Sequence, residues 1–212
     1  MSLNNIKNQK EYWGAQLKTP GRGSPSNWRA NGISFQTNMR ELQIHAFFNK
    51  NFSGGTILDL GSYDGYYIPW FEKANKIICV DLYEESFEFI KNIIATDNEK
   101  EIEYYLTSGN ELRGVESESV DFIFSRDSLV RMPYEDYRLY ACEFDRVLKK
   151  GGKFFIHLAH GETTSSNDPP YSFSKKEIIE MHDWATITVS GEKGVPFPLH
   201  WGSFIFGEKN EN

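Results

Sequence analysis

The sequence predicts an α/β fold in which a mostly parallel sheet carries helices on both faces. From residue 56 onward, short runs rich in β-branched and aromatic residues alternate with longer segments of helical periodicity. That alternation is typical of parallel strands joined by helical crossovers. The first run, residues 56–60, leads into a glycine-containing turn. Because ligands bind at the carboxyl ends of such strands, this turn is the first candidate for a binding site.

The composition is that of a single globular domain with an acidic surface. The chain has 212 residues, of which 39% are hydrophobic and 25% are charged, as is usual for soluble proteins. No run of 18 apolar residues occurs, and residues 1–9 are polar, so we expect a cytoplasmic protein without a membrane span or signal peptide. The net charge of −7 disfavours a nucleic-acid partner, because binding to polyanions depends on clustered Lys and Arg.

Residues 1–50 contain no clear strand. Apolar residues at positions 39, 42, 44, 47 and 48 predict a helix over residues 38–49. Residues 19–25, rich in Pro and Gly, predict a loop. We therefore expect the sheet domain to begin after a helical and loop extension.

The later elements follow in order along the chain. Apolar and aromatic residues after Gly65 predict a helix between the first two strands. Gly151 and Gly152 are interpreted as the stop of a helix, and Ser174 with Glu177 forms a capping box at the start of another. Helices are expected over residues 84–95, 134–149 and 174–183, and strands over residues 76–82, 102–106, 120–125, 153–158, 186–189 and 200–207.

The turn after the first strand fits a dinucleotide site poorly. Counted from Gly61, the Gly-x-Gly-x-x-Gly template places Tyr63 and Tyr66 where glycines belong. Tyr63 would crowd a pyrophosphate, and Asp59 would set a negative charge beside it. A cationic ligand without phosphate removes this conflict, and S-adenosylmethionine (SAM) is such a ligand. The glycines let the backbone turn sharply and let a ligand approach closely.

Two stretches resemble class I SAM-dependent methyltransferases. Residues 59–65 read D-L-G-S-Y-D-G, which is similar to the first motif of that family. Residues 119–157 continue as the family does, with S-V-D-F-I-F in a strand and R-V-L-K-K-G-G at a helix end. The resemblance covers residues 54–160, and it departs from the family at Tyr63, where a small residue is usual.

The resemblance, to methyltransferase-11-like small-molecule enzymes, implies a Rossmann-like, mostly parallel seven-stranded sheet with an antiparallel C-terminal strand. It implies that residues 1–50 cap the cofactor mouth and that residues 51–212 form the SAM-binding domain. Asp81, at the end of the second strand, can accept from both ribose hydroxyls. The Asn110 amide oxygen can accept from the adenine amino group. The expected cofactor-binding residues are Asp59, Gly61, Ser62, Tyr63, Gly65, Asp81, Leu82, Asn110 and Ser125.

Methyl transfer to a hydroxyl needs alignment and removal of a proton. His157 and His160 are the preferred bases because imidazole titrates near neutrality. Asp127 is expected either to orient that imidazole or to accept the proton itself. No complete metal-ligand constellation is visible, so no metal is expected. The candidate substrate-binding residues are Tyr12, Trp13, Trp28, Arg29 and Arg126.

The function expected is methyl transfer from SAM to a hydroxyl of a small molecule, such as a sugar or a secondary metabolite. The alternative is a non-catalytic SAM- or nucleoside-binding module that acts through a protein partner, and an NAD-dependent oxidoreductase is a third hypothesis. Residues 168–171 read D-P-P-Y, a string found in methyltransferases that act on adenine in DNA. Here it follows the fifth strand rather than the fourth, so we interpret it as a proline loop.

Overall fold

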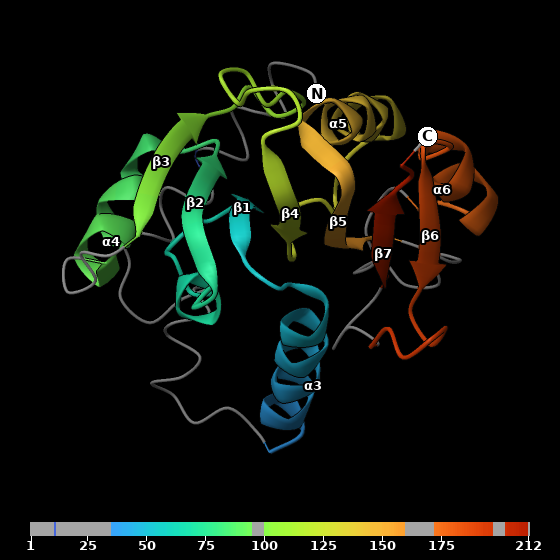
Figure 1. Cartoon of the computed structure of the whole chain (residues 1–212), viewed down its shortest axis with the longest axis horizontal. Helices are drawn as coiled ribbons and strands as arrows, with labels where there is room; N and C mark the ends of the chain where they lie inside the picture. Colours follow the sequence, from blue (N-terminus) through green and yellow to red (C-terminus); the bar gives the residue numbers. More distant parts are fainter. Residues whose placement is uncertain (1–10, 12–34, 95–99, 160–171, 197–201, 212) are drawn as a thin grey trace.

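A computed structural model describes residue 11 and residues 35–94, 100–159, 172–196 and 202–211. These residues build a seven-stranded sheet in the order β3-β2-β1-β4-β5-β7-β6 (Figure 1). The first five strands run parallel, and β7 pairs antiparallel with both β5 and β6. The predicted fold class is therefore confirmed. The strands are β1 (Gly55–Leu60), β2 (Ala74–Asp81), β3 (Glu101–Leu106), β4 (Val120–Ser125), β5 (Leu148–Leu158), β6 (Ala185–Val189) and β7 (Ser203–Lys209).

Helices cover both faces of the sheet. In the described ranges they are α3 (Phe35–Asn51), α4 (Glu84–Ile94), α5 (Tyr134–Val147) and α6 (Lys175–Met181). Figure 1 shows α4 beside β3 at one end of the sheet and α6 beside β6 at the other. Successive side chains of a strand point to opposite faces, so Ile57 packs with α3 and α4, whereas Leu58 packs with α5 and α6. In this part of the chain no helix is long and apolar enough to cross a bilayer.

Helix α3 is built into the core. Ile44 and Phe48 are fully buried. The ring of Phe48 lies 5.3 Å from that of Phe122 and 5.8 Å from that of Phe124, both in edge-to-face contact, a geometry that aromatic rings favour. The last helix before the sheet domain thus covers the centre of one sheet face.

The prediction of a helix between β1 and β2 is wrong. Residues 61–73 connect the two strands and contain a single short 3-10 turn, η1 (Ile68–Trp70). Pro69 lies within that turn, and proline is tolerated at the start of a helix but not in its interior. With no α-helix here, α3 fills this region of the sheet face.

The glycine pair after α5 does not stop a helix. Helix α5 ends at Val147, and β5 begins at Leu148 and runs through both glycines. The pairing of β4 with β5 shifts register between Val120 and Phe122, and Gly151 has a φ of 71°. Glycine supplies the backbone freedom that such an irregularity needs. The capping box at the start of α6 is confirmed, with Ser174 and Glu177 bonded reciprocally.

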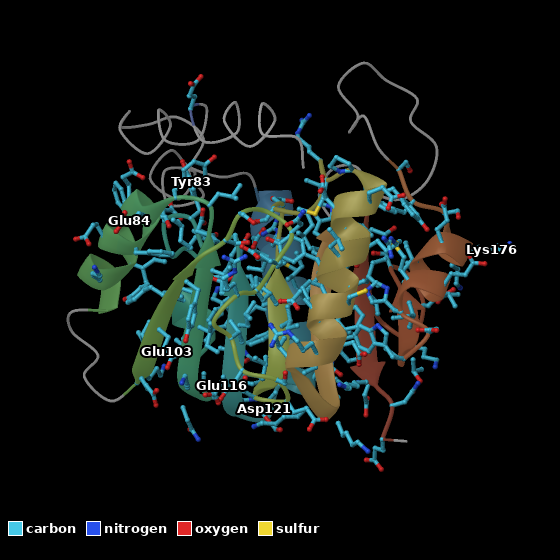
Figure 2. All side chains as sticks on the ribbon, turned by 90° about the horizontal axis from the view of Figure 1, so that it is seen from above. Tyr83, Glu84, Glu103, Glu116, Asp121 and Lys176 are labelled. Atoms are coloured by element: carbon cyan, nitrogen blue, oxygen red, sulfur yellow. The ribbon has the colours of Figure 1, made fainter. Side chains whose placement is uncertain are left out.

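The carboxyl ends of the parallel strands share one edge of the sheet. Figure 2 shows Tyr83, which follows β2, at the opposite end of the sheet from Glu103 and Asp121. Because β2, β4 and β5 end on the Tyr83 side, the side chains that follow these strands gather there. This is the edge where open parallel sheets bind their ligands.

Candidate active site

The loop after β1 is shaped by its contact with the loop after β4. Gly61 has a φ of 81°, and a Cβ on it would lie 1.9 Å from the Ser128 Oγ. Glycine is therefore required by a close approach of protein to protein. We had expected the glycine to make room for a ligand, and in the described structure the atoms that occupy this space belong to Ser128.

Asp81 holds the backbone of this loop. Its Oδ2 accepts a 2.8 Å hydrogen bond from the Tyr63 backbone N–H, and its Oδ1 accepts one of 3.1 Å from that of Tyr83. Tyr63 has a φ of 46°, which is uncommon for a residue with a side chain. A carboxylate has about four acceptor sites, so Asp81 can hold the loop and still accept from a ribose.

Asp59 supplies a buried carboxyl group beneath the loop. Its side chain is 2% exposed, and its Oδ2 has no hydrogen-bond partner within the described ranges. Burial, and then the charge of Asp81, raise the pKa of Asp59 to about 8. An unpaired carboxyl oxygen in this position fits a cationic ligand, because a positive charge would stabilise the ionised form.

The other predicted cofactor residues have distinct surroundings. The Asn110 amide nitrogen donates to Asp136 Oδ1 at 3.3 Å, so its carbonyl oxygen stays available as an acceptor. Ser125 is fully buried, and its hydroxyl donates to the Leu60 carbonyl at 2.8 Å. This bond ties the end of β4 to the end of β1 and does not present the hydroxyl to a ligand. Gly65 lies in a tight turn with a φ of 75°, Leu82 is half-buried, and the Ser62 hydroxyl donates to the Asp59 carbonyl at 2.8 Å.

Two of the predicted catalytic residues meet across neighbouring strands. His157 Nδ1 lies 2.5 Å from Asp127 Oδ1. The imidazole is only 2% exposed, whereas the Asp127 side chain is 43% exposed. Asp127 follows β4 in the left-handed conformation, with a φ of 59°. The structure therefore builds a carboxylate–imidazole pair in which the carboxylate faces solvent.

Arg126, predicted to meet the substrate, is enclosed by protein. Its side chain is 4% exposed. It donates to the Glu41 carboxylate of α3 and to the Tyr67 hydroxyl, and its guanidinium lies 5.5 Å from the centre of the Tyr67 ring. Burial opposes its charge, but Tyr67, Asp127 and Glu41 together raise the pKa of Arg126.

Glu41 and Tyr67 are not among the residues that the sequence pattern predicted for the site. A signal for Glu41 existed, because positions 41, 44 and 48 share one face of the predicted helix. A charged residue on a buried helix face predicts a buried partner. The candidates Tyr12, Trp13, Trp28, Arg29 and His160, and the D-P-P-Y string, lie outside the described residues.

Residues 58–156 match a family model described as a methyltransferase domain. The matched segment runs from β1 to β5 and contains the loops just described. Residues 58–156 therefore form a methyltransferase domain, and the fold is that of class I SAM-dependent methyltransferases. SAM is accordingly the cofactor of this methyltransferase, and the unpaired carboxyl oxygen of Asp59 fits it. No curated protein sequence matches the chain.

Solved structures share the fold of the methyltransferase. A SAM-dependent methyltransferase from Aquifex aeolicus is 19% identical with a TM-score of 0.58, over 89% of this chain and 100% of its own. DhpI, in a complex described as DhpI-SAM-HEP, is 14% identical with a TM-score of 0.70, over 99% of both chains. Phosphoethanolamine N-methyltransferase 1 of Haemonchus contortus, solved with phosphoethanolamine and S-adenosylhomocysteine, is 15% identical with a TM-score of 0.68, over 99% of this chain and 50% of its own.

Proposed function

We propose that the methyltransferase transfers the methyl group of SAM to a hydroxyl group of a small molecule, such as a sugar or a secondary metabolite. The observation that carries this proposal is the 2.5 Å contact between Asp127 and His157 at the carboxyl edge of the sheet. A hydroxyl oxygen needs a group that takes its proton, and a carboxylate–imidazole pair is suited to that task. The solved relative that holds phosphoethanolamine supports a small acceptor.

The cofactor lies, in this proposal, over the ends of β1 and β2. Asp59 meets its cationic part, Asp81 accepts from the ribose, and Asn110 accepts from the adenine amino group. SAM supplies an activated methyl group, so the protein has mainly to align the acceptor and remove its proton. The fold brings these residues together at the carboxyl ends of the strands.

Asp127 is the member of the pair that receives the acceptor. It is the exposed member, whereas a Cβ built on Gly202, just before β7, would lie 3.1 Å from His157 Nε2. The imidazole is 2% exposed, so its second ring nitrogen is enclosed by protein. The acceptor oxygen would bond to the methyl carbon as the carbon–sulfur bond breaks and S-adenosylhomocysteine leaves, and the proton of that oxygen would pass to the Asp127 carboxylate. His157 donates its Nδ1–H to that carboxylate and fixes its direction.

Residues 1–50 act as a cap over the cofactor mouth, and residues 51–212 form the SAM-binding domain. The described part of residues 1–50 is α3 (Phe35–Asn51), which packs on the sheet face and also reaches the site. Glu41, in α3, reaches Arg126, which adjoins Asp127 in sequence. The cap is thus in contact with the loop that carries the exposed carboxylate.

The test is methyl transfer from isotope-labelled SAM to a panel of hydroxylated small molecules. Wild type should label at least one acceptor, and Asp127→Asn should lose that activity while binding SAM in calorimetry. Asp183→Asn is the matched control, because Asp183 is an exposed aspartate that follows α6. SAM binding with no labelled product from any acceptor would favour the non-catalytic module instead.

A further inference from the structure

Three consecutive residues after β4 reach three different parts of the site. Arg126 donates to Glu41 of α3, and Asp127 contacts His157 of β5. Ser128 Oγ lies 3.4 Å from the Gly61 carbonyl oxygen in the cofactor loop and 3.2 Å from the Arg126 carbonyl oxygen. One short turn therefore joins the cap helix, the carboxylate–imidazole pair and the cofactor loop.

The ion pair between Arg126 and Glu41 is poorly explained by stability alone. The side chains are 4% and 13% exposed. In the described part of the chain, Arg126 Nε and Glu41 Oε2 are buried and have no hydrogen-bond partner. Burying two charges with incomplete hydrogen bonding often stabilises a protein less than apolar residues of the same size. A role in the site would account for the pair.

Asp127 needs something to hold it. Its side chain is 43% exposed, so water competes for both carboxylate oxygens. Oδ1 lies against His157, and Oδ2 lies 3.9 Å from Arg126 Nε. The imidazole and the guanidinium thus take one oxygen each. The guanidinium therefore restrains the carboxylate from rotating into solvent on that side.

We propose that Arg126 is a positioning residue, whose guanidinium, anchored by Glu41 and Tyr67, keeps the Asp127 carboxylate against His157. The inference rests on the proposed function in one respect, namely that this pair takes the acceptor's proton. It assigns to Arg126 an indirect role, through Asp127, in place of contact with the acceptor. It also makes α3 part of the catalytic arrangement, because Glu41 belongs to that helix.

The hydrogen bond itself gives a test that needs no acceptor. A ring N–H that donates over 2.5 Å to a carboxylate, on an imidazole 2% exposed, should give a strongly deshielded, slowly exchanging proton signal in NMR. Wild type should show this signal, and Asp127→Asn should remove it, which assigns it to His157. Arg126→Gln should abolish it, and Arg126→Lys, which keeps the charge without the planar fork, should weaken it.

Matched variants separate a loss of Asp127 positioning from a general loss of folding. Glu41→Gln keeps the shape of the anchor, removes its charge and should weaken the signal. Arg138→Gln is the control, because Arg138 forms an exposed pair with Glu135 on α5, and it should leave the signal unchanged. Thermal unfolding and SAM calorimetry show that each variant is folded. If Arg126→Gln does not fold, Glu41→Gln and Arg126→Lys decide the matter.

The outcomes distinguish this proposal from the proposed function. An unchanged signal in folded Arg126→Gln, or in Glu41→Gln and Arg126→Lys, overturns the positioning role and leaves the function standing. A missing signal in wild type overturns the positioning role as well, whereas labelled product would still support the function. With an acceptor in hand, Arg126→Gln should lower kcat by about 10²-fold, as misplacement of a reacting group by ~1 Å does, and leave the KM for SAM unchanged.

Discussion

His157 and His182 are both buried and have different partners. His157 is 2% exposed and lies against the Asp127 carboxylate at the carboxyl edge of the sheet. His182, after α6, is fully buried; its Nε2 lies 3.1 Å from the Tyr137 hydroxyl and its Nδ1 lies 2.8 Å from the Ile178 carbonyl oxygen. The rings of Phe154 and Trp184 pack around it.

The difference lies in the partners of each ring. A carboxylate can hold a proton that an imidazole stabilises, so the region around His157 can take part in proton transfer. Around His182, burial lowers the pKa to about 4, and the hydrogen bond to Ile178 and the charge of Asp183 offset only part of that effect. Burial by itself therefore does not mark a functional histidine, and the position of a carboxylate does.

The largest effect on methyl transfer should come from substituting His157. His157→Gln should lower methyl transfer by about 10²-fold or more, because the Asp127 carboxylate that takes the proton is no longer held in place, while SAM binding persists. Turnover of labelled SAM measures the first quantity, and calorimetry measures the second. His182→Leu is the contrasting variant and should keep turnover within a few-fold. Equal losses from both substitutions would contradict the distinction between the two regions.

Burial of Asp59 should make the free energy of unfolding depend on pH. Its pKa is raised to about 8 by burial and by Asp81. The unfolded state loses this proton above about pH 4, so stability should fall as pH rises from about 4 to 8. At about 1.4 kcal/mol per unit, this cost reaches roughly 4 kcal/mol at neutral pH.

Asp59→Asn should therefore raise the thermal midpoint at pH 8 and weaken SAM binding, a familiar exchange between stability and function. Thermal unfolding at pH 5 and pH 8, with and without SAM, measures both effects. Tighter SAM binding by the variant would show that Asp59 does not meet the cation.

His182 should make the protein sensitive to acid. Its folded pKa of about 4 lies below the unfolded value of 6.5, so the unfolded state takes up the proton first. The stability is fully present above pH 6.5 and is lost as pH falls toward 4, by roughly 3 kcal/mol in total. Denaturant unfolding across this window should show a shallower slope for His182→Leu than for wild type. A slope that is the same in both proteins would assign the acid sensitivity to other groups.

The smallest effect should come from an ion pair remote from both regions. Arg138 and Glu135, on the outer side of α5, are 52% and 77% exposed, and exposed pairs contribute about 0.5 kcal/mol. Arg138→Gln should change denaturant midpoints little and turnover not at all. A large change in turnover would show that the surface of α5 communicates with the site.

The sequence determined which segments form strands and where they lie along the chain. Residues 56–60, 76–82 and 120–125 were recognised because buried strands need unbroken β-branched and aromatic runs. Asp81 was expected at the end of the second strand, and it is the last residue of β2. The capping box of Ser174 could be predicted from the sequence because both of its hydrogen bonds are local.

Only the tertiary structure decided which of the polar residues meet. Asp127 and His157 are 30 residues apart, and Arg126 and Glu41 are 85 apart, so their contacts follow from strand order and from the seat of α3 on the sheet. The short 3-10 turn in place of a helix, and the passage of β5 through Gly151, were also set by neighbouring elements. Local preferences of a few tenths of a kcal/mol per residue are overridden by packing. The polar residues could be identified in the sequence, but their contacts depend on how α3, β4 and β5 pack.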